Sequence, residues 1–248
     1  MIKKYVFGPI DSRRLGRSLG VDLVPLKTCP LDCIYCEAKA TTLLTMERKE
    51  YVPVDRVFEE LEFTLNPSPE LDYITFSGSG EPTLNSRIGD VVKFIRNRYP
   101  QYKICLLTNG LLLGDPKLQQ EIADIDLLIP SLDGSNAAEY KAVNRPIASM
   151  PFDRMLQDLK NYLPHAPMPV HLELFIVPGV NDSEESIIRF ASIIRELKVD
   201  RIQLNTLDRP GAVSDLKRTD EATIARFIHH LKPLAPIDSL LSFHGKRK

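Results

Sequence analysis

Three of the four cysteines lie within one short segment of the chain. Cys29, Cys33 and Cys36 are separated by four and then three positions, in the segment Thr-Cys-Pro-Leu-Asp-Cys-Ile-Tyr-Cys. Such spacing lets one loop place three thiolates around a single metal centre, and thiolates are preferred ligands of iron–sulfur clusters. A cubane has four irons, so three protein ligands leave one iron able to bind another molecule. The segment therefore predicts a [4Fe–4S] site with one open coordination position.

Two other interpretations of the cysteines stay open. A structural zinc ion normally has four ligands, and the chain has no second cysteine pair to complete such a set. Unreactive buried thiols would be unusual so close together in a loop that contains a proline. The fourth cysteine, Cys105, lies in the apolar run 103–107 and is predicted to be a small buried core residue.

A second chemically distinctive segment, Ser77–Leu84, reads Ser-Gly-Ser-Gly-Glu-Pro-Thr-Leu and follows an apolar run. Glycines at the end of a strand let main-chain carbonyls approach a ligand closely. Glu81 adds an anion that would face an ammonium group. A tight turn between a strand and a helix is the alternative interpretation.

The elements that must position these segments alternate between strand and helix. Apolar positions spaced by three and four predict helices at 54–65, 87–99, 153–163, 183–197 and 220–231. Apolar β-rich runs predict strands at 18–24, 73–76, 103–107, 127–130, 170–177 and 201–204. Strict alternation implies right-handed crossovers and a parallel sheet. We therefore expect an α/β fold, a (β/α)6 partial TIM barrel, with the cysteine loop at the carboxyl end of the first strand.

Length and composition favour one domain over residues 1–248, with a leader (1–17), a barrel core (18–210) and a C-terminal helix and tail (211–248). Hydrophobic residues make up 43% and charged residues 26%, as in ordinary globular proteins. The net charge of −1 shows no basic excess of the kind that nucleic-acid-binding proteins usually carry. The N-terminus lacks the apolar core of a signal peptide, and no run has the length of a membrane span, so we expect a cytoplasmic protein without a membrane partner.

In these motifs the chain resembles the radical S-adenosylmethionine (SAM) superfamily. The CxxxCxxC signature of that superfamily matches the three cysteines, and the segment 79–82 resembles its GGEP motif, which receives the methionine amino group, with a serine in place of the first glycine. Further matches are the segments 107–110, 131–134 and 175–179. The resemblance implies a cofactor-binding role for Tyr35, Ser79, Gly80, Glu81, Pro82, Asn109, Ser131, Asp133 and Val177.

The resemblance also implies an enzyme of the oxidoreductase or transferase type with two cofactors, a [4Fe–4S] cluster and SAM. The partner would be a one-electron donor of the flavodoxin or ferredoxin type. Reductive cleavage of SAM would give methionine and a 5′-deoxyadenosyl radical that abstracts a hydrogen atom from the substrate. The sequence does not identify the substrate, which is a small molecule, an RNA or a protein, and it names no further catalytic residue.

Arginines in the leader are the first candidates for substrate recognition. Arg13, Arg14 and Arg17 alternate with glycines, which predicts an anion-binding loop. There are two alternatives. The arginines could form a solvated basic surface, or they could brace the open edge of the barrel by pairing with acidic residues. Asn205 and Arg209 follow the last strand and are further candidates for the substrate site.

Two features resemble a narrower group of radical SAM proteins. The leader and the segment 204–211, Leu-Asn-Thr-Leu-Asp-Arg-Pro-Gly, are similar to Fe–S oxidoreductases related to the wyosine-forming tRNA-modifying enzymes. Those enzymes have a second cluster, for which this chain has only Cys105 to spare. The alternatives are a glycyl-radical-enzyme activase and a non-catalytic cluster- or zinc-binding module.

The cluster prediction can be tested on single cysteines. We expect Cys33→Ala to abolish iron loading after anaerobic reconstitution, because each of the three thiolates binds one iron and no spare ligand exists. Cys105→Ala, the matched control, should load iron like the unaltered protein. Iron and acid-labile sulfide assays measure the result, and full loading of the Cys33→Ala protein would contradict the prediction.

Overall fold

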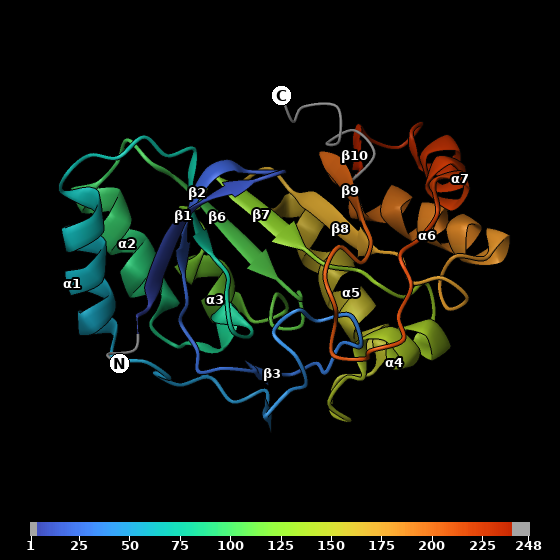
Figure 1. Ribbon diagram of the computed structural model, residues 1–248, viewed down its shortest axis with the longest axis horizontal. Coiled ribbons are helices and arrows are strands. Elements are labelled where there is room, and N and C mark those ends of the chain that lie inside the picture. The colour runs from blue at the N-terminus through green and yellow to red at the C-terminus, as the bar shows by residue number, and fades with distance from the viewer. Residues whose placement is uncertain (1–3, 240–248) are drawn as a thin grey trace.

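The computed structural model describes residues 4–239 and has an α/β fold with a mostly parallel sheet (Figure 1). Four of its strands pair in parallel in the order β2 (Gly16–Val21), β5 (Tyr73–Phe76), β6 (Lys103–Thr108), β7 (Leu127–Pro130). A second parallel set has the order β8 (His171–Phe175), β9 (Arg201–Asn205), β10 (Ile237–Ser239). Parallel bridges Leu128–Val170 and Ser131–Glu173 join the two sets. The six strands predicted from the sequence are thus confirmed.

Helices follow these strands and cover the outer side of the sheet, with α1 and α2 at one end and α6 and α7 at the other (Figure 1). The five predicted helices are confirmed as α1 (Val54–Leu65), α2 (Ile88–Arg98), α5 (Phe152–Tyr162), α6 (Glu184–Leu197) and α7 (Glu221–Leu231). Their apolar faces are buried; in α1 these are Val54, Val57, Leu61 and Leu65. Burial of such a stripe against the sheet is what stabilises helices of this length.

Sequence reasoning missed two helices, α3 (Pro116–Glu121) and α4 (Ala137–Asn144). Both begin at an N-cap side chain that accepts a main-chain hydrogen bond. Asp115 accepts from the Lys117 N–H in α3, and Asn136 accepts from the Glu139 N–H in α4. Both are short and have a weak apolar face, so periodicity did not reveal them. The two-residue strands β3 (Thr28–Cys29) and β4 (Leu43–Leu44) were missed for the same reason.

The segment expected to be a leader, residues 1–17, contributes to the sheet in the part that the structure describes. Residues Val6–Ser12 form β1, which pairs antiparallel with β2 at the sheet edge. Most of β1 is exposed, so it lacks the alternation of apolar residues that predicts a strand. At the other end of the chain, residues Ile237–Ser239 of the expected tail pair with β9, and residues 240–248 lie outside the described part.

The turn between β1 and β2 packs against the face of the sheet that is turned away from the helices. Leu15, only 5% exposed, contacts a small cluster that contains Cys105, Leu127 and Ile129. Cys105 and Ile104 are adjacent in β6 and therefore point to opposite faces, and Ile104 belongs to the main core beneath the helices. The prediction of a buried, structural Cys105 is confirmed.

No helix among residues 4–239 is long and apolar enough to cross a membrane.

The packing of this turn gives a prediction about stability. We expect Leu15→Ala to lower the free energy of unfolding by about 2–5 kcal/mol, since it removes a buried side chain and leaves a cavity. Ile10→Ala in the same hairpin is the matched control, because Ile10 is 50% exposed and its removal should change stability by less than about 0.5 kcal/mol. Urea unfolding measures both free energies. Equal losses of unfolding free energy in the two variants would show that burial of Leu15 does not stabilise the fold.

Candidate active site

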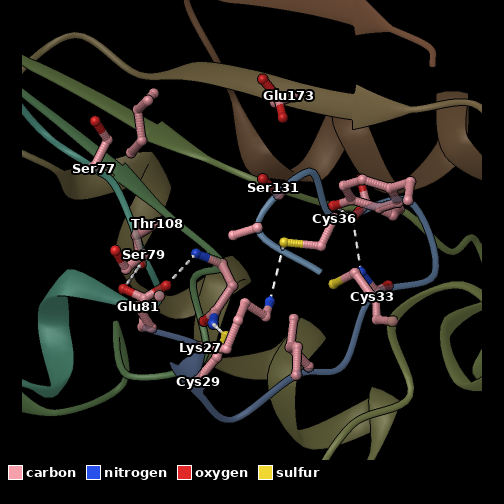
Figure 2. Close-up of a pocket in the computed structure, with 18 of the residues that line it drawn as sticks. Lys27, Cys29, Cys33, Cys36, Ser77, Ser79, Glu81, Thr108, Ser131 and Glu173 are labelled. Atoms are coloured by element: carbon pink, nitrogen blue, oxygen red, sulfur yellow. Dashed lines mark hydrogen bonds between the residues drawn. The ribbon is translucent and has the colours of Figure 1, made fainter. Parts of the chain in front are cut away.

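The cysteine loop and the carboxyl ends of β5, β6 and β7 enclose one cavity of about 280 Å³ (Figure 2), which we call the cysteine pocket. Parallel strands end at the same edge of a sheet, so residues far apart in the sequence meet there. Most of the predicted cofactor-site residues line it, namely Cys29, Cys33, Cys36, Tyr35, Ser79, Gly80, Glu81, Asn109, Ser131 and Asp133. Pro82, which begins the 3-10 turn η1 (Pro82–Leu84), and Val177 do not line it. Val177 instead packs in a neighbouring cluster with Ile34 and Phe175.

Each of the three cysteine sulfurs accepts a hydrogen bond from a different part of the chain. Lys27 Nζ lies 3.0 Å from the sulfur of Cys36, and Asn144 Nδ2 lies 3.3 Å from that of Cys33. Asn109 Nδ2 lies 3.6 Å from the sulfur of Cys29. N–H donors to cluster-bound sulfur stabilise its negative charge and are one way in which proteins tune the reduction potential.

The cysteine pocket offers three thiols as metal-binding groups. Among residues 4–239, no three His, Cys, Asp or Glu side chains converge so that they could hold one metal ion. A zinc ion requires its ligands at one point, whereas in a cubane each thiolate binds a different iron. Burial raises the pKa of the Cys29 thiol to about 12, with a contribution from the charge of Glu81. The thiol is therefore neutral until a metal centre displaces its proton.

Main-chain contacts join the cysteine loop to the turn after β5. The N–H of Lys27 donates to the carbonyl of Ser79 at 2.6 Å, and the N–H of Glu81 donates to the carbonyl of Thr28 at 3.0 Å. Between these two bonds, a Cβ at Gly80 would lie 2.1 Å from the Thr28 oxygen. Only glycine allows the main chain at position 80 to lie this close to the Thr28 carbonyl. The position of Thr28 therefore explains why residue 80 is a glycine.

The serine that replaces the first glycine of the GGEP motif has a partner. The side chain of Ser79 donates a hydrogen bond to Asp22, whose carboxylate also accepts from the Ser79 N–H at 3.1 Å. Asp22 follows β2, so this pair ties the turn to the neighbouring strand. Gly78 precedes it with a φ of +135°, a conformation that side chains rarely adopt, and a Cβ there would lie 2.7 Å from Asp22.

The carboxylate of Glu81 accepts four hydrogen bonds within the protein. It accepts from the N–H and hydroxyl of Thr83 (3.1 and 2.6 Å), from the hydroxyl of Thr108 (2.7 Å) and from the N–H of Asn109 (2.8 Å). Burial raises its pKa, and these hydrogen bonds oppose that shift. These hydrogen bonds make Glu81 a brace between the ends of β5 and β6, and its expected contact with an ammonium group stays a prediction.

Asp133 is the second buried carboxylate of the pocket. It accepts from the Tyr35 hydroxyl at 2.5 Å, from Asn144 Nδ2 at 2.7 Å and from the Phe175 N–H at 2.9 Å. Burial raises the pKa of Asp133, and burial together with the charge of Asp133 raises that of Tyr35. The Tyr35 ring stacks on Phe175 with ring centres 3.7 Å apart. Tyr35 is thus fixed by stacking on one side and by a hydrogen bond at its tip.

A second hollow, of about 300 Å³, adjoins the cysteine pocket and shares Tyr35, Cys36 and Glu173 with it. The hollow brings together four of the five predicted substrate residues, namely Arg13, Arg14, Asn205 and Arg209. Arg17 is the exception, because it lines a separate surface depression with Asp72 and Tyr102. The expectation of one loop with three arginines is therefore corrected: the turn directs only the first two toward the site.

The arginines of this second hollow are paired with carboxylates. Arg14 forms an ion pair with Glu173 of β8, and its Nη1 also lies 3.1 Å from the Gln203 side chain of β9. Arg13 pairs with Asp208 at 3.0 Å. In these contacts the turn between β1 and β2 bridges to the far strands of the sheet, which supports the interpretation of the arginines as a brace.

The loop 206–219 between β9 and α7, which we call the strap, covers the cysteine loop. The Val213 N–H donates to the Ile34 carbonyl at 3.0 Å, and Lys39 donates to the carbonyls of residues 210 and 211. A Cβ at Gly211 would lie 2.8 Å from the main chain of Tyr35. A hydrogen bond of 2.9 Å between the hydroxyls of Thr206 and Thr219 closes the strap at its base.

Sequence reasoning missed three contributors to the pocket, Lys27, Thr108 and Asn144. Thr108 lies in the quoted segment 107–110, so the strand-end rule was a usable signal. Lys27 directly precedes the cysteine segment, where a cation near thiolates is a reasonable expectation. Asn144 ends α4, a helix that the sequence did not reveal, and nothing in the sequence links it to Cys33.

Comparison with known proteins identifies the class. The family model for the radical SAM superfamily matches residues 23–191, and the chain belongs to this superfamily. Within it, the chain is 32% identical over 219 residues to a UPF0026 protein of Helicobacter pylori, a match that covers 87% of this chain and 70% of the relative. It is 36% identical over 206 residues to a protein named GTPase Obg from Brachyspira hyodysenteriae, covering 83% of this chain but 30% of that protein's length.

A solved structure agrees in fold. A radical SAM methyltransferase from Sphaerobacter thermophilus superimposes with a TM-score of 0.70 and 21% identity, covering 90% of this chain and 65% of that one. Members of the superfamily are enzymes that use a [4Fe–4S] cluster and SAM. The prediction of radical SAM membership is confirmed.

The brace at Glu81 gives a prediction. We expect Glu81→Ala to leave the donors of Thr83, Thr108 and Asn109 without a partner, which should lower the free energy of unfolding by about 1–3 kcal/mol. The affinity for SAM, measured by the spectral shift of the reconstituted cluster, should fall as well. Glu47→Ala, whose parent side chain is 63% exposed, is the control and should change neither quantity. Unchanged stability and SAM affinity in the Glu81→Ala protein would contradict the assigned brace.

Proposed function

We propose that this protein is a radical SAM enzyme in which Cys29, Cys33 and Cys36 bind the [4Fe–4S] cluster and the turn at residues 78–80 binds the methionine part of SAM. One observation carries the proposal. The three cysteines and the strand-end turn line the same cavity and are joined by the main-chain bonds on both sides of Gly80. A structural metal site has no use for an amino-acid-binding turn beside it.

When bound, the cluster and SAM supply a radical that abstracts a hydrogen atom from the substrate. The protein's own residues would hold and shield these groups. Lys27, Asn109 and Asn144 would donate hydrogen bonds to the cysteine sulfurs, as they do in this structure. The strap and the stacked pair of Tyr35 and Phe175 would exclude water from one side of the pocket.

Several finer assignments belong to the same proposal. Strands β2 and β5 to β9, with the bridges between β7 and β8, support a (β/α)6 partial barrel, formed by one domain over residues 1–248. The similarity to Fe–S oxidoreductases related to wyosine-forming enzymes remains a proposal about subgroup. The electron source would be a flavodoxin or a ferredoxin.

The other functions considered from the sequence have less support. A zinc module has less support because a structural zinc ion normally takes four ligands, and the segment offers three cysteines without a second pair. A glycyl-radical-enzyme activase is the remaining alternative within the superfamily. The matched relatives extend beyond this chain, since it spans 30% of the Brachyspira protein and 70% of the Helicobacter protein.

Anaerobic reconstitution tests the proposed function. We expect about four irons per chain and dithionite-dependent formation of 5′-deoxyadenosine from SAM, measured by liquid chromatography and mass spectrometry. The variant with Cys29, Cys33 and Cys36 all replaced by Ala is the control and should form none. Zinc binding without SAM cleavage in the unaltered protein would overturn the proposal.

A further inference from the structure

The second hollow opens directly beside the cysteine pocket and is lined largely by polar side chains. It shares Cys36 and Glu173 with that pocket, so a molecule bound there lies next to the proposed cofactor site. Its volume of about 300 Å³ lies at the low end of the range for small-molecule sites. The following inference rests on the proposed function.

The charges that line the second hollow are balanced. Three guanidinium groups face three carboxylates in the pairs Arg13–Asp208, Arg14–Glu173 and Arg209–Glu37. A site for a polyphosphate backbone needs an excess of cations. The balance therefore favours a ligand that carries both signs of charge.

The three ion pairs differ in the exposure of their side chains. The exposure determines which carboxylates a ligand could displace from their arginines. The Arg14 and Glu173 side chains are 23% and 14% exposed, and separating them would leave buried charges without partners. The Arg13–Asp208 side chains are 32% and 30% exposed. Arg209 and Glu37 are more exposed still, and exposed pairs of this kind are weak. A ligand carboxylate can therefore replace Asp208 or Glu37 on its arginine at little cost.

Glu173 offers the complementary group. Its Oε2 takes part in the ion pair with Arg14 and lies 3.5 Å from the Asn205 side-chain amide. Within residues 4–239, no group donates a hydrogen bond to Oε1. Figure 2 shows this side chain directed from β8 toward the cysteine pocket. A largely buried acceptor that is held at one oxygen and open at the other is suited to an ammonium group.

We propose that the second hollow is the substrate chamber and that it binds a small zwitterion of the amino-acid type. The ammonium group of the ligand binds Oε1 of Glu173, and its carboxylate binds Arg13 or Arg209 at the rim. Arg14 is a positioning residue, because it holds Glu173 ionised and directed into the chamber. This assignment replaces the expectation of a purely anionic ligand with one that carries both charges.

Isotope transfer tests the assignment. Extract from cells grown in deuterium oxide is divided into small zwitterions retained by a cation exchanger at low pH, small anions retained by an anion exchanger, and macromolecules including RNA. Each is incubated with the reconstituted enzyme, SAM and dithionite. Abstraction moves one deuterium atom from a substrate C–D bond to the 5′ carbon, giving singly deuterated 5′-deoxyadenosine and a substrate radical.

Deuterium should come from the zwitterion fraction. Transfer only from the anion fraction, only from RNA or other macromolecules, or from no fraction overturns the chamber assignment. Unlabelled 5′-deoxyadenosine in the same reactions reports SAM cleavage separately. A failure of the chamber assignment thus differs from a failure of the proposed function, in which no 5′-deoxyadenosine forms at all.

Variants locate the chamber. In Arg13→Gln, the ratio of deuterated to total 5′-deoxyadenosine should fall about tenfold, as expected when one charge-assisted contact is lost. The double variant Arg14→Gln with Glu173→Gln keeps a neutral hydrogen-bonded pair in place of the buried charges, and it should show the same loss without a large drop in melting temperature. Arg17→Gln is the matched control from the same hairpin and should keep the normal ratio. Normal ratios in both test variants would place the substrate elsewhere.

Discussion

The contact between the cysteine loop and the turn after β5 is the constraint on which the pocket depends. Two main-chain hydrogen bonds, from Lys27 to Ser79 and from Glu81 to Thr28, enclose Gly80 between them. Because these bonds use main-chain atoms and the space at Gly80 admits no Cβ, the two segments behave as one rigid unit. The three cysteines and the turn at residues 78–80 are therefore held in a fixed relation by main-chain contacts alone.

Two buried carboxylates extend this rigid unit across the sheet. Glu81 links β5 to the end of β6, and Asp133 links β7 to β8 and to Tyr35 of the cysteine loop. Burying a carboxylate is costly, and three or four hydrogen bonds to each group offset that cost. Polar residues of the pocket that the sequence predicts as ligand contacts thus also hold neighbouring strands together by hydrogen bonds. A substitution among them is expected to affect stability and cofactor affinity together.

The sequence predicted the fold and the pocket correctly where a local pattern of residue types has one structural meaning. Strict strand–helix alternation predicted the parallel strands, and the cysteine spacing together with Ser79–Pro82 predicted the components of the pocket. The sequence could not predict the partners of Arg13 and Arg14, because those carboxylates belong to β8 and to the strap, far along the chain. It also could not place Asn144 beside Cys33, since that contact depends on where α4 ends. Long-range pairing of polar side chains follows from the fold and has no local pattern.

The strap has a consequence for the order of events in biosynthesis. Residues 206–219 follow strands β2 and β5 to β9 in the chain, whereas the cysteine loop follows β2. During translation the thiols leave the ribosome well before the segment that will cover them. A carrier of the proposed cluster would therefore reach the cysteines only until Val213 and Gly211 dock against Ile34 and Tyr35. The same loop that shields the mature centre would oppose its repair after oxidative loss of iron, unless the strap first detaches.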